Sequence, residues 1–175
     1  MRRFNTTAIA VITLASGFAG CGKSPVAENS TAPVETTTVA YLVNEEPAGA
    51  VGVADARESK DTATEITVVG RIGGSAKPFV DGTAAFTIVD PKVPHCSAEE
   101  GCPMPWDYCC ETAALPTSTA LIKVVDPQGQ LVTEDARKLL GVKELAMVVV
   151  HGKAERDAEG NLTVLADQVF VKESK

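Results

Sequence analysis

The chain has 175 residues, of which 45% are hydrophobic, and a formal net charge of −7. The length suits one domain with short appendages, and the hydrophobic content excludes a mostly disordered chain. A mean hydropathy of +0.07 excludes a membrane protein with many spans, and the acidic balance disfavours nucleic acid phosphates as a partner.

The first twenty residues predict an export signal. Arg2 and Arg3 are followed by an apolar run over residues 8–15 and by small residues before Cys21. This run is too short to cross about 30 Å of hydrocarbon. A signal peptide over residues 1–20 is therefore a better interpretation than a membrane span.

The end of this signal resembles the lipobox of bacterial lipoproteins. Ala19-Gly20-Cys21 fits that motif, and Phe18 departs from its usual leucine. The resemblance implies that Cys21 is lipidated and anchors an exported protein to a bacterial membrane, facing the periplasm. Gly22, where aspartate would favour retention at the inner membrane, favours the outer membrane. The alternative is an ordinary secretory signal followed by a chance cysteine.

The residues after the signal change from a linker to a folded domain. Residues 21–40 are polar and show no helical or strand period, which predicts a flexible tether. Residues 41–63 predict a peripheral segment, in which residues 54–60 form either a short helix or a strap. Without Arg2 and Arg3 the mature chain holds 14 basic and 23 acidic residues, a net charge of −9.

Residues 64–175 predict a mainly β domain. Five short β-rich runs are separated by turn residues. A helix is expected over residues 133–141, with Thr133 as its N-cap and Gly141 at its end. Gly70, inside the first run, predicts a bulge or a tight bend. The expected strands are 65–72, 84–89, 120–125, 145–154 and 162–171.

This order resembles the OB-fold, a five-stranded, partly open Greek-key barrel. Three strands precede the helix, and a hairpin with Gly160-Asn161 turn chemistry closes the domain. The fourth run is apolar on both faces, as expected for a barrel strand covered by a helix. We therefore expect a small five-stranded OB-fold-like barrel with one short helix and a cysteine-rich loop over residues 92–116.

The cysteine-rich loop holds Cys96, Cys102, Cys109 and Cys110. An even number of cysteines in an exported chain favours disulfides or a metal site. A bond between the neighbours Cys109 and Cys110 would be strained. This leaves Cys96–Cys109 with Cys102–Cys110, or Cys96–Cys110 with Cys102–Cys109. Either pairing would hold a proline-rich loop with little to bury, at about 2–4 kcal/mol for each bond.

The same loop also suits a soft metal. The four cysteines, with His95 as an alternate ligand, exceed the four ligands that zinc needs. Thiolates also suit cuprous copper or an iron–sulfur cluster. The spacing C-x5-C-x6-C-C differs from the paired C-x2-C of a zinc ribbon, and the C-x-x-C-H motif of haem attachment is absent. The sequence leaves disulfides and metal both open.

Several stretches together resemble a group of uncharacterised lipoproteins of planctomycete-type bacteria. They are Val69–Gly74, Ala85–Asp90, the PWDYCC motif of Pro105–Cys110, and Gly152–Ala154. The resemblance covers most of residues 41–172. It implies export and an OB-like core, and it supplies neither an established activity nor a catalytic residue.

These patterns predict a binding or structural module rather than an enzyme, and no nucleic acid partner. We expect a lipid-anchored domain whose disulfide-held loop presents a surface to an envelope protein or polymer. The alternative is a zinc- or copper-binding lipoprotein. Trp106 and Tyr108 are expected to cap the barrel end, Asp90 to accept backbone N–H groups, and His151 to pack at the sheet rim. The sequence has no Ser-His-Asp order and no phosphate loop.

Overall fold

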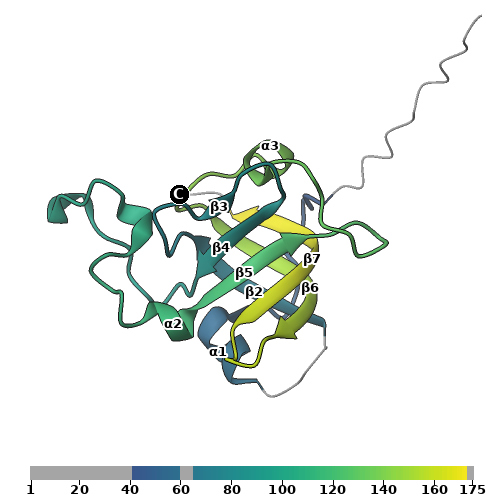
Figure 1. The fold of residues 1–175 in the computed structure, drawn as a ribbon, viewed down its shortest axis with the longest axis horizontal. Coiled ribbons are helices and arrows are strands. Elements are labelled where there is room, and N and C mark those ends of the chain that lie inside the picture. The colour runs from purple at the N-terminus through teal and green to yellow at the C-terminus, as the bar shows by residue number, and fades with distance from the viewer. Residues whose placement is uncertain (1–40, 60–64, 173–175) are drawn as a thin grey trace, which may run out of the picture. The chain divides into compact units, whose positions relative to one another are not determined.

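Five strands close into a barrel in the computed structural model, which describes residues 41–59 and 65–172 (Figure 1). The signal over residues 1–20, the tether over 21–40 and Cys21 lie outside the described residues. Within the described part of the chain, no helix has the length and apolar character that crossing a membrane requires. The barrel strands are β2 (Glu65–Ile72), β4 (Ala85–Val89), β5 (Thr119–Val124), β6 (Met147–Arg156) and β7 (Leu162–Lys172).

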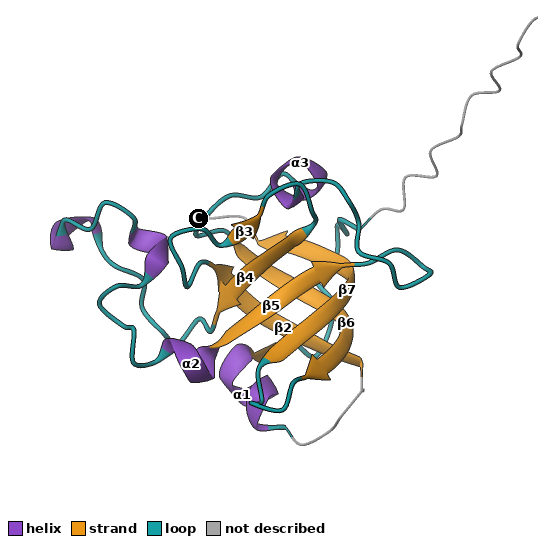
Figure 2. Cartoon of the chain, in the orientation of Figure 1, coloured by secondary structure: helices purple, strands orange, loops and turns teal. Residues whose placement is uncertain are grey.

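The strand order β2-β6-β7-β5-β4, closed by pairing of β4 with β2, is that of an OB-fold (Figure 2). β5 and β7 are parallel, and the other neighbouring barrel strands are antiparallel. β-Branched residues at every second position build this barrel: in β5, for example, Ile122 and Val124 face the core and are fully buried. The predicted fold class is confirmed.

Three short helices accompany the barrel rather than the expected one. α3 (Ala136–Leu140) lies between β5 and β6, as predicted, and ends at Gly141 with φ +66°. Thr133 is not its N-cap. Asp135 is, and its carboxylate accepts a 2.9 Å hydrogen bond from the backbone N–H of Arg137. The other two helices are α1 (Val53–Glu58), in the stretch where a helix or strap was expected, and α2 (Leu115–Ser118), which was not expected.

The segment before the barrel is packed into it. Tyr41, Val53 and Ala56 belong to the main buried cluster. Tyr41 also accepts a 2.7 Å hydrogen bond at its carbonyl from the backbone N–H of Val169 in β7. β1 (Val51–Gly52) runs parallel to β2, and a second short strand, β3 (Phe79–Val80), pairs with β4. The described part of the segment expected to be peripheral therefore contributes to the core.

Gly70 and Gly152 lie inside strands, and Gly70 does not form the bulge or tight bend that was expected there. At Gly70 the β2–β6 register runs on without a shift. A Cβ there would lie 2.7 Å from Cδ1 of Ile88, so Gly70 permits close packing rather than a bulge. The β-bulge lies in the β6–β7 pair, between His151 and Gly152. A side chain at Gly152 would collide with the backbone carbonyl of Leu165.

Candidate metal-binding site

The loop between β4 and β5 brings its four cysteines into one cluster. Cys102 and Cys109 are closest, with 3.3 Å between their sulfur atoms. The Cys96–Cys109, Cys102–Cys110 and Cys109–Cys110 sulfur pairs are 3.6, 3.9 and 4.0 Å apart. All four sulfur atoms lie within 4.8 Å of one another, and no disulfide joins any two of them. The loop thus forms a cysteine cluster capable of binding a metal.

These separations can be compared with two kinds of chemistry. Zinc–sulfur bonds of about 2.3 Å at tetrahedral angles place the ligand sulfurs about 3.8 Å apart. A disulfide brings two sulfurs to about 2.05 Å. Four of the six sulfur–sulfur distances, 3.3–4.0 Å, lie near this tetrahedral spacing, and each of these four pairs would have to approach by more than 1 Å to form a disulfide. Both disulfide pairings left open by the sequence join sulfurs that already lie within this cluster, so distance alone selects neither.

A buried carboxylate fixes the start of the loop on the barrel. Asp90, at the end of β4, is only 1% exposed. Its two oxygens accept 2.8 Å hydrogen bonds from the backbone N–H groups of Ala54 in α1 and Lys92 in the loop. Its own N–H donates to the carbonyl of Ser118 at the far end of the loop. The expected capping role of Asp90 is confirmed, and Asp90 joins both ends of the loop to α1.

The aromatic residues before the cysteine pair anchor the middle of the loop. The Tyr108 ring is fully buried beside Val89 and Val93. Trp106 accepts a 2.8 Å hydrogen bond at its carbonyl from the N–H of Gly74, and its indole N–H donates to the carbonyl of Ala76 at 3.3 Å. These contacts agree with the expectation that the aromatics cap the barrel end.

A local backbone reversal then presents the cysteine pair. Tyr108 has φ +56°, in the left-handed region, and directly follows the 3-10 helix η2 (Pro105–Asp107). Asp107 accepts a 2.9 Å hydrogen bond at its carboxylate from the backbone N–H of Cys109. The turn directs Cys109 and Cys110 back toward Cys102, which explains how neighbours in sequence join one cluster.

The cluster is buried on one side and open on the other. Cys96 is 3% exposed, Cys102 is half-buried, and Cys109 and Cys110 are exposed. The loop itself is acidic: between Lys92 and Lys123 the chain has no lysine or arginine. That stretch carries four acidic residues, Glu99, Glu100, Asp107 and Glu111. The site therefore combines thiols with a local potential that attracts cations.

Hydrogen bonding separates the pKa values of the thiols. The backbone N–H of Cys110, together with neighbouring thiols, lowers the pKa of Cys96 below its usual value. Bonding to Cys96 raises the pKa of Cys110 to about 11, and bonding to Cys102 raises that of Cys109 well above its usual range. The pKa of Cys96 therefore lies below those of Cys109 and Cys110, and a metal ion must displace protons from the two exposed thiols in order to bind them.

His95 is placed beside the cluster but is not one of the grouped ligands. Its Nδ1 lies 2.9 Å from the carbonyl oxygen of Cys96. Because a carbonyl only accepts, Nδ1 carries the proton, and in the neutral ring Nε2 keeps its lone pair. His151, which we expected at the sheet rim, is partly exposed and pairs with Asp167 at 2.8 Å.

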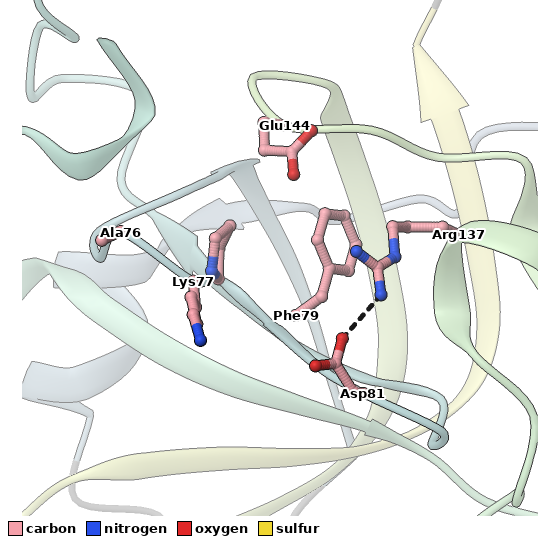
Figure 3. Close-up of a pocket in the computed structure, with 7 residues that line it drawn as sticks. Ala76, Lys77, Phe79, Asp81, Arg137 and Glu144 are labelled. Atoms are coloured by element: carbon pink, nitrogen blue, oxygen red, sulfur yellow. Dashed lines mark hydrogen bonds and ion pairs between the residues drawn. The ribbon is translucent and has the colours of Figure 1, made fainter. Parts of the chain in front are cut away.

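Apart from the cysteine cluster, the structure has a hollow of about 200 Å³ next to β3 (Figure 3). Its charged lining residues are Lys77, Asp81, Arg137 and Glu144. Arg137 stacks over the Phe79 ring, with 5.2 Å to the ring centroid. It also forms ion pairs with Asp135 at 2.6 Å and Asp81 at 2.8 Å. Two carboxylates already neutralise this guanidinium, so the hollow is a poor site for an anion.

Comparisons with family models and with curated proteins each find no match. Two solved structures are similar to the chain. The hypothetical protein ygiW from E. coli has 13% identity and a TM-score of 0.37, over 72% of this chain and 94% of that one. The OBody AM1L10, solved bound to hen egg-white lysozyme, has 12% identity and a TM-score of 0.38, over 75% of this chain and 98% of that one. Likeness this distant says nothing of what this chain binds.

The sequence identified the four cysteines but not the residues that position them. Gly73 is the clearest example, because a Cβ there would lie 2.6 Å from the carbonyl oxygen of Trp106 and 2.8 Å from the Tyr108 ring. The Gly73-Gly74 pair marked only the end of a strand. Nothing in the sequence indicated that Trp106 and Tyr108, more than thirty residues later, would pack on it.

Proposed function

We propose that this protein is an exported, lipid-anchored metal-binding protein. Its OB-fold-like barrel carries a loop that binds one soft metal ion, zinc or cuprous copper, through Cys96, Cys102, Cys109 and Cys110. The observation that carries the proposal is the grouping of four sulfur atoms within 4.8 Å of one another. Thiolate ligands select these two ions over hard cations such as magnesium and calcium.

The compactness of the cluster favours one ion over a larger cofactor. An iron–sulfur cluster distributes its thiolates over two or four irons separated by sulfide. In this loop four of the six sulfur pairs are only 3.3–4.0 Å apart, and all six lie within 4.8 Å. Such short separations suit thiolates that share a single tetrahedral centre.

The location of the site rests on the N-terminal sequence. Lipidation at Cys21 would anchor the chain to the membrane, facing the periplasm, with residues 21–40 as a tether to the barrel. The outer membrane is favoured over the inner membrane because Gly22 follows the cysteine. In an oxidising compartment, bound metal would also keep the four thiols from forming disulfides.

A disulfide-held module is the second candidate. The 3.3 Å contact between Cys102 and Cys109 supports it, since a small movement would bring these sulfurs to bonding distance. In that form the protein would present its loop to an envelope protein or polymer and bind no metal. The two candidates differ in the oxidation state of the same four residues.

The intact mass of the native protein, recovered from membranes in detergent, separates the candidates. We expect a lipid adduct at the N-terminal cysteine, one metal ion per chain and four thiols that react with iodoacetamide after denaturation with a chelator. Two disulfides and no stoichiometric metal would overturn the metal proposal. An unmodified N-terminus would overturn the anchor and leave the metal site standing.

A titration with matched variants tests the ligands directly. The full chain with Cys21→Ser, prepared under reducing conditions, should bind one Cd²⁺ with thiolate-to-metal charge-transfer absorption. Cys102→Ser in that background should lose about a quarter of the absorption and bind more weakly. Ser97→Ala, at a neighbouring position without a sulfur, is the matched control and should leave both unchanged.

A further inference from the structure

We infer that this site passes its ion to, or takes it from, a thiol-bearing partner protein, and that the exchange occurs through Cys109 and Cys110. The inference rests on the metal binding proposed above and adds its partner and its mode of use. In this inference the cluster is a metal-transfer site rather than a structural metal site.

The first argument is the exposure of the ligands. The buried Cys96 holds the inner side of the cluster, whereas Cys109 and Cys110 are exposed on the outer side. Four cysteines fill the coordination shell of zinc, so a transfer requires one of these ligands to leave the ion, and only the exposed pair can be reached from outside the loop. A thiol from another protein can reach the ion on this outer side without opening the barrel.

The second argument is that other contacts attach the loop to the barrel. Asp90 holds both ends of the loop through hydrogen bonds of 2.8 Å. Tyr108 is buried against Val89 and Val93, and the carbonyl of Trp106 bonds to Gly74. None of these contacts uses a cysteine side chain. Removal of the ion therefore leaves the loop attached, which is what repeated loading and unloading requires.

The transfer itself is a ligand substitution without electron transfer. An acceptor thiol loses its proton, and its sulfur forms a bond to the ion as the ion becomes five-coordinate. The bond from the ion to Cys110 Sγ then breaks, and the released thiolate takes up one proton. Repetition at Cys109 leaves the ion bound by two acceptor thiolates together with Cys102 and Cys96. Two further ligands from the acceptor then replace Cys102 and Cys96, and each released thiolate takes up one proton. The metal keeps its oxidation state throughout.

The third argument concerns the partner's charge. Glu99 and Glu100 are exposed beside the cluster, in the 3-10 helix η1 (Ala98–Glu100). The stretch between Lys92 and Lys123 contains no lysine or arginine, so the charged side chains of the loop are all acidic. A partner with basic residues around its thiols would be attracted to this face, whereas an acidic one would be repelled. The geometry and charge together specify a basic, thiol-bearing partner.

The experiment measures transfer from the full chain with Cys21→Ser, loaded with one equivalent of Cd²⁺ and followed by charge-transfer absorption. The acceptors are a neutral dithiol, dithiothreitol, and an anionic one, dimercaptosuccinate. We expect the rate to rise linearly with acceptor concentration, about tenfold over a tenfold range. At low salt the neutral acceptor should be the faster, and this preference should shrink at 0.5 M salt because the charges are screened.

A charge variant and its matched control locate the effect. Glu99→Gln with Glu100→Gln should speed transfer to dimercaptosuccinate roughly two- to threefold at low salt. Glutamine at position 100 can still accept the hydrogen bond from Ser97 N–H. Glu45→Gln with Glu155→Gln changes the net charge equally at exposed positions outside the loop and should have no effect.

The outcomes keep this inference apart from the proposed function. If the chain binds no stoichiometric metal, the proposed function fails and the inference fails with it. If metal binds but leaves at a rate independent of acceptor concentration, the cluster is a structural metal site, and only the inference is overturned. Equal rates for both acceptors at every salt concentration would overturn the basic character of the partner.

Discussion

The barrel and the cysteine-rich loop are stabilised in different ways. The barrel contains a contiguous apolar core, with residues such as Phe86, Ile88 and Ile122 fully excluded from solvent. Between its entry at Asp90 and its exit at α2, the loop buries little apart from Tyr108, Val93 and Cys96. The loop depends on anchoring hydrogen bonds and, we propose, on a bound ion.

This difference has a consequence for how the two regions tolerate change. Burial of apolar surface supplies most of the folding free energy, so the barrel accounts for the stability of the domain. The loop needs only enough contacts to keep its sulfurs near one another. Substitutions in the barrel should therefore reduce stability, and substitutions in the loop should alter binding with little effect on stability.

The largest expected effect is in the core. Phe86→Ala should lower the free energy of unfolding by about 3–5 kcal/mol, because it leaves a cavity at a fully buried position next to Phe79. Urea unfolding measures this. The paired loop substitution, Cys110→Ser in metal-free protein, should change stability by less than about 0.5 kcal/mol. Equal losses for the two variants would show that barrel and loop are one energetic unit.

A substitution at the junction should affect both properties. Gly73→Ala places a Cβ against the Trp106 carbonyl and the Tyr108 ring. Because backbone must shift, we expect a loss of about 1–3 kcal/mol and weaker metal binding, measured by unfolding and by competition with a chelator. Gly82→Ala is the control: its φ of +74° causes strain, but the added Cβ meets open space, so only stability should fall. Unchanged metal binding in Gly73→Ala would mean that this contact does not position the cysteines.

Tyr108→Phe should show that the loop anchor is apolar. The ring is fully buried, and its hydroxyl has no hydrogen-bond partner in the described part of the chain. Loss of an unsatisfied hydroxyl should leave stability unchanged or raise it by up to about 1 kcal/mol. Tyr108→Leu, which removes the ring, is the comparison and should be less stable. A marked loss in Tyr108→Phe would reveal a partner for the hydroxyl.

The smallest expected effect is on stability at acid pH, and it concerns Asp135, the N-cap of α3. Hydrogen bonds from the Arg137 side chain hold the pKa of Asp135 well below its ordinary value of 3.8. A carboxyl whose pKa is lowered by folding adds stability above its unfolded pKa and loses that contribution as the pH falls below it. Asp135→Asn keeps an N-cap residue, so its melting temperature should be slightly below that of the parent at pH 7. The difference should shrink below about pH 4. A constant difference would assign the effect to geometry rather than charge.

Much of the barrel was predictable from local patterns. The β2 strand matches its predicted range, because alternating β-branched residues between turn residues specify a half-buried strand. The helix between β5 and β6 was placed correctly, yet its cap was assigned two residues too early. Asp135 caps it because Arg137 secures the carboxylate with additional bonds, and this side-chain pairing is not visible in a propensity pattern.

Contacts between distant segments were not predictable in the same way. The segment around Tyr41 was expected to be peripheral, but it pairs with Val169, more than a hundred residues later. Gly70 was expected to mark a bulge or a tight bend, whereas its role is to make room for Ile88 on the neighbouring strand β4. Both depend on barrel closure, which determines the neighbours of each position.

The sequence by itself determined the order of strands, the position of the helix and the identity of the four cysteines, because periodicity and residue type are local properties. Only the tertiary structure decided that these cysteines form one cluster in which Cys109 and Cys110 are exposed. That decision depends on the left-handed turn at Tyr108, the close approach of the loop to Gly73 and the burial of Asp90. Each of these features depends on how distant segments pack together, and the spacing of residues along the chain does not predict that packing.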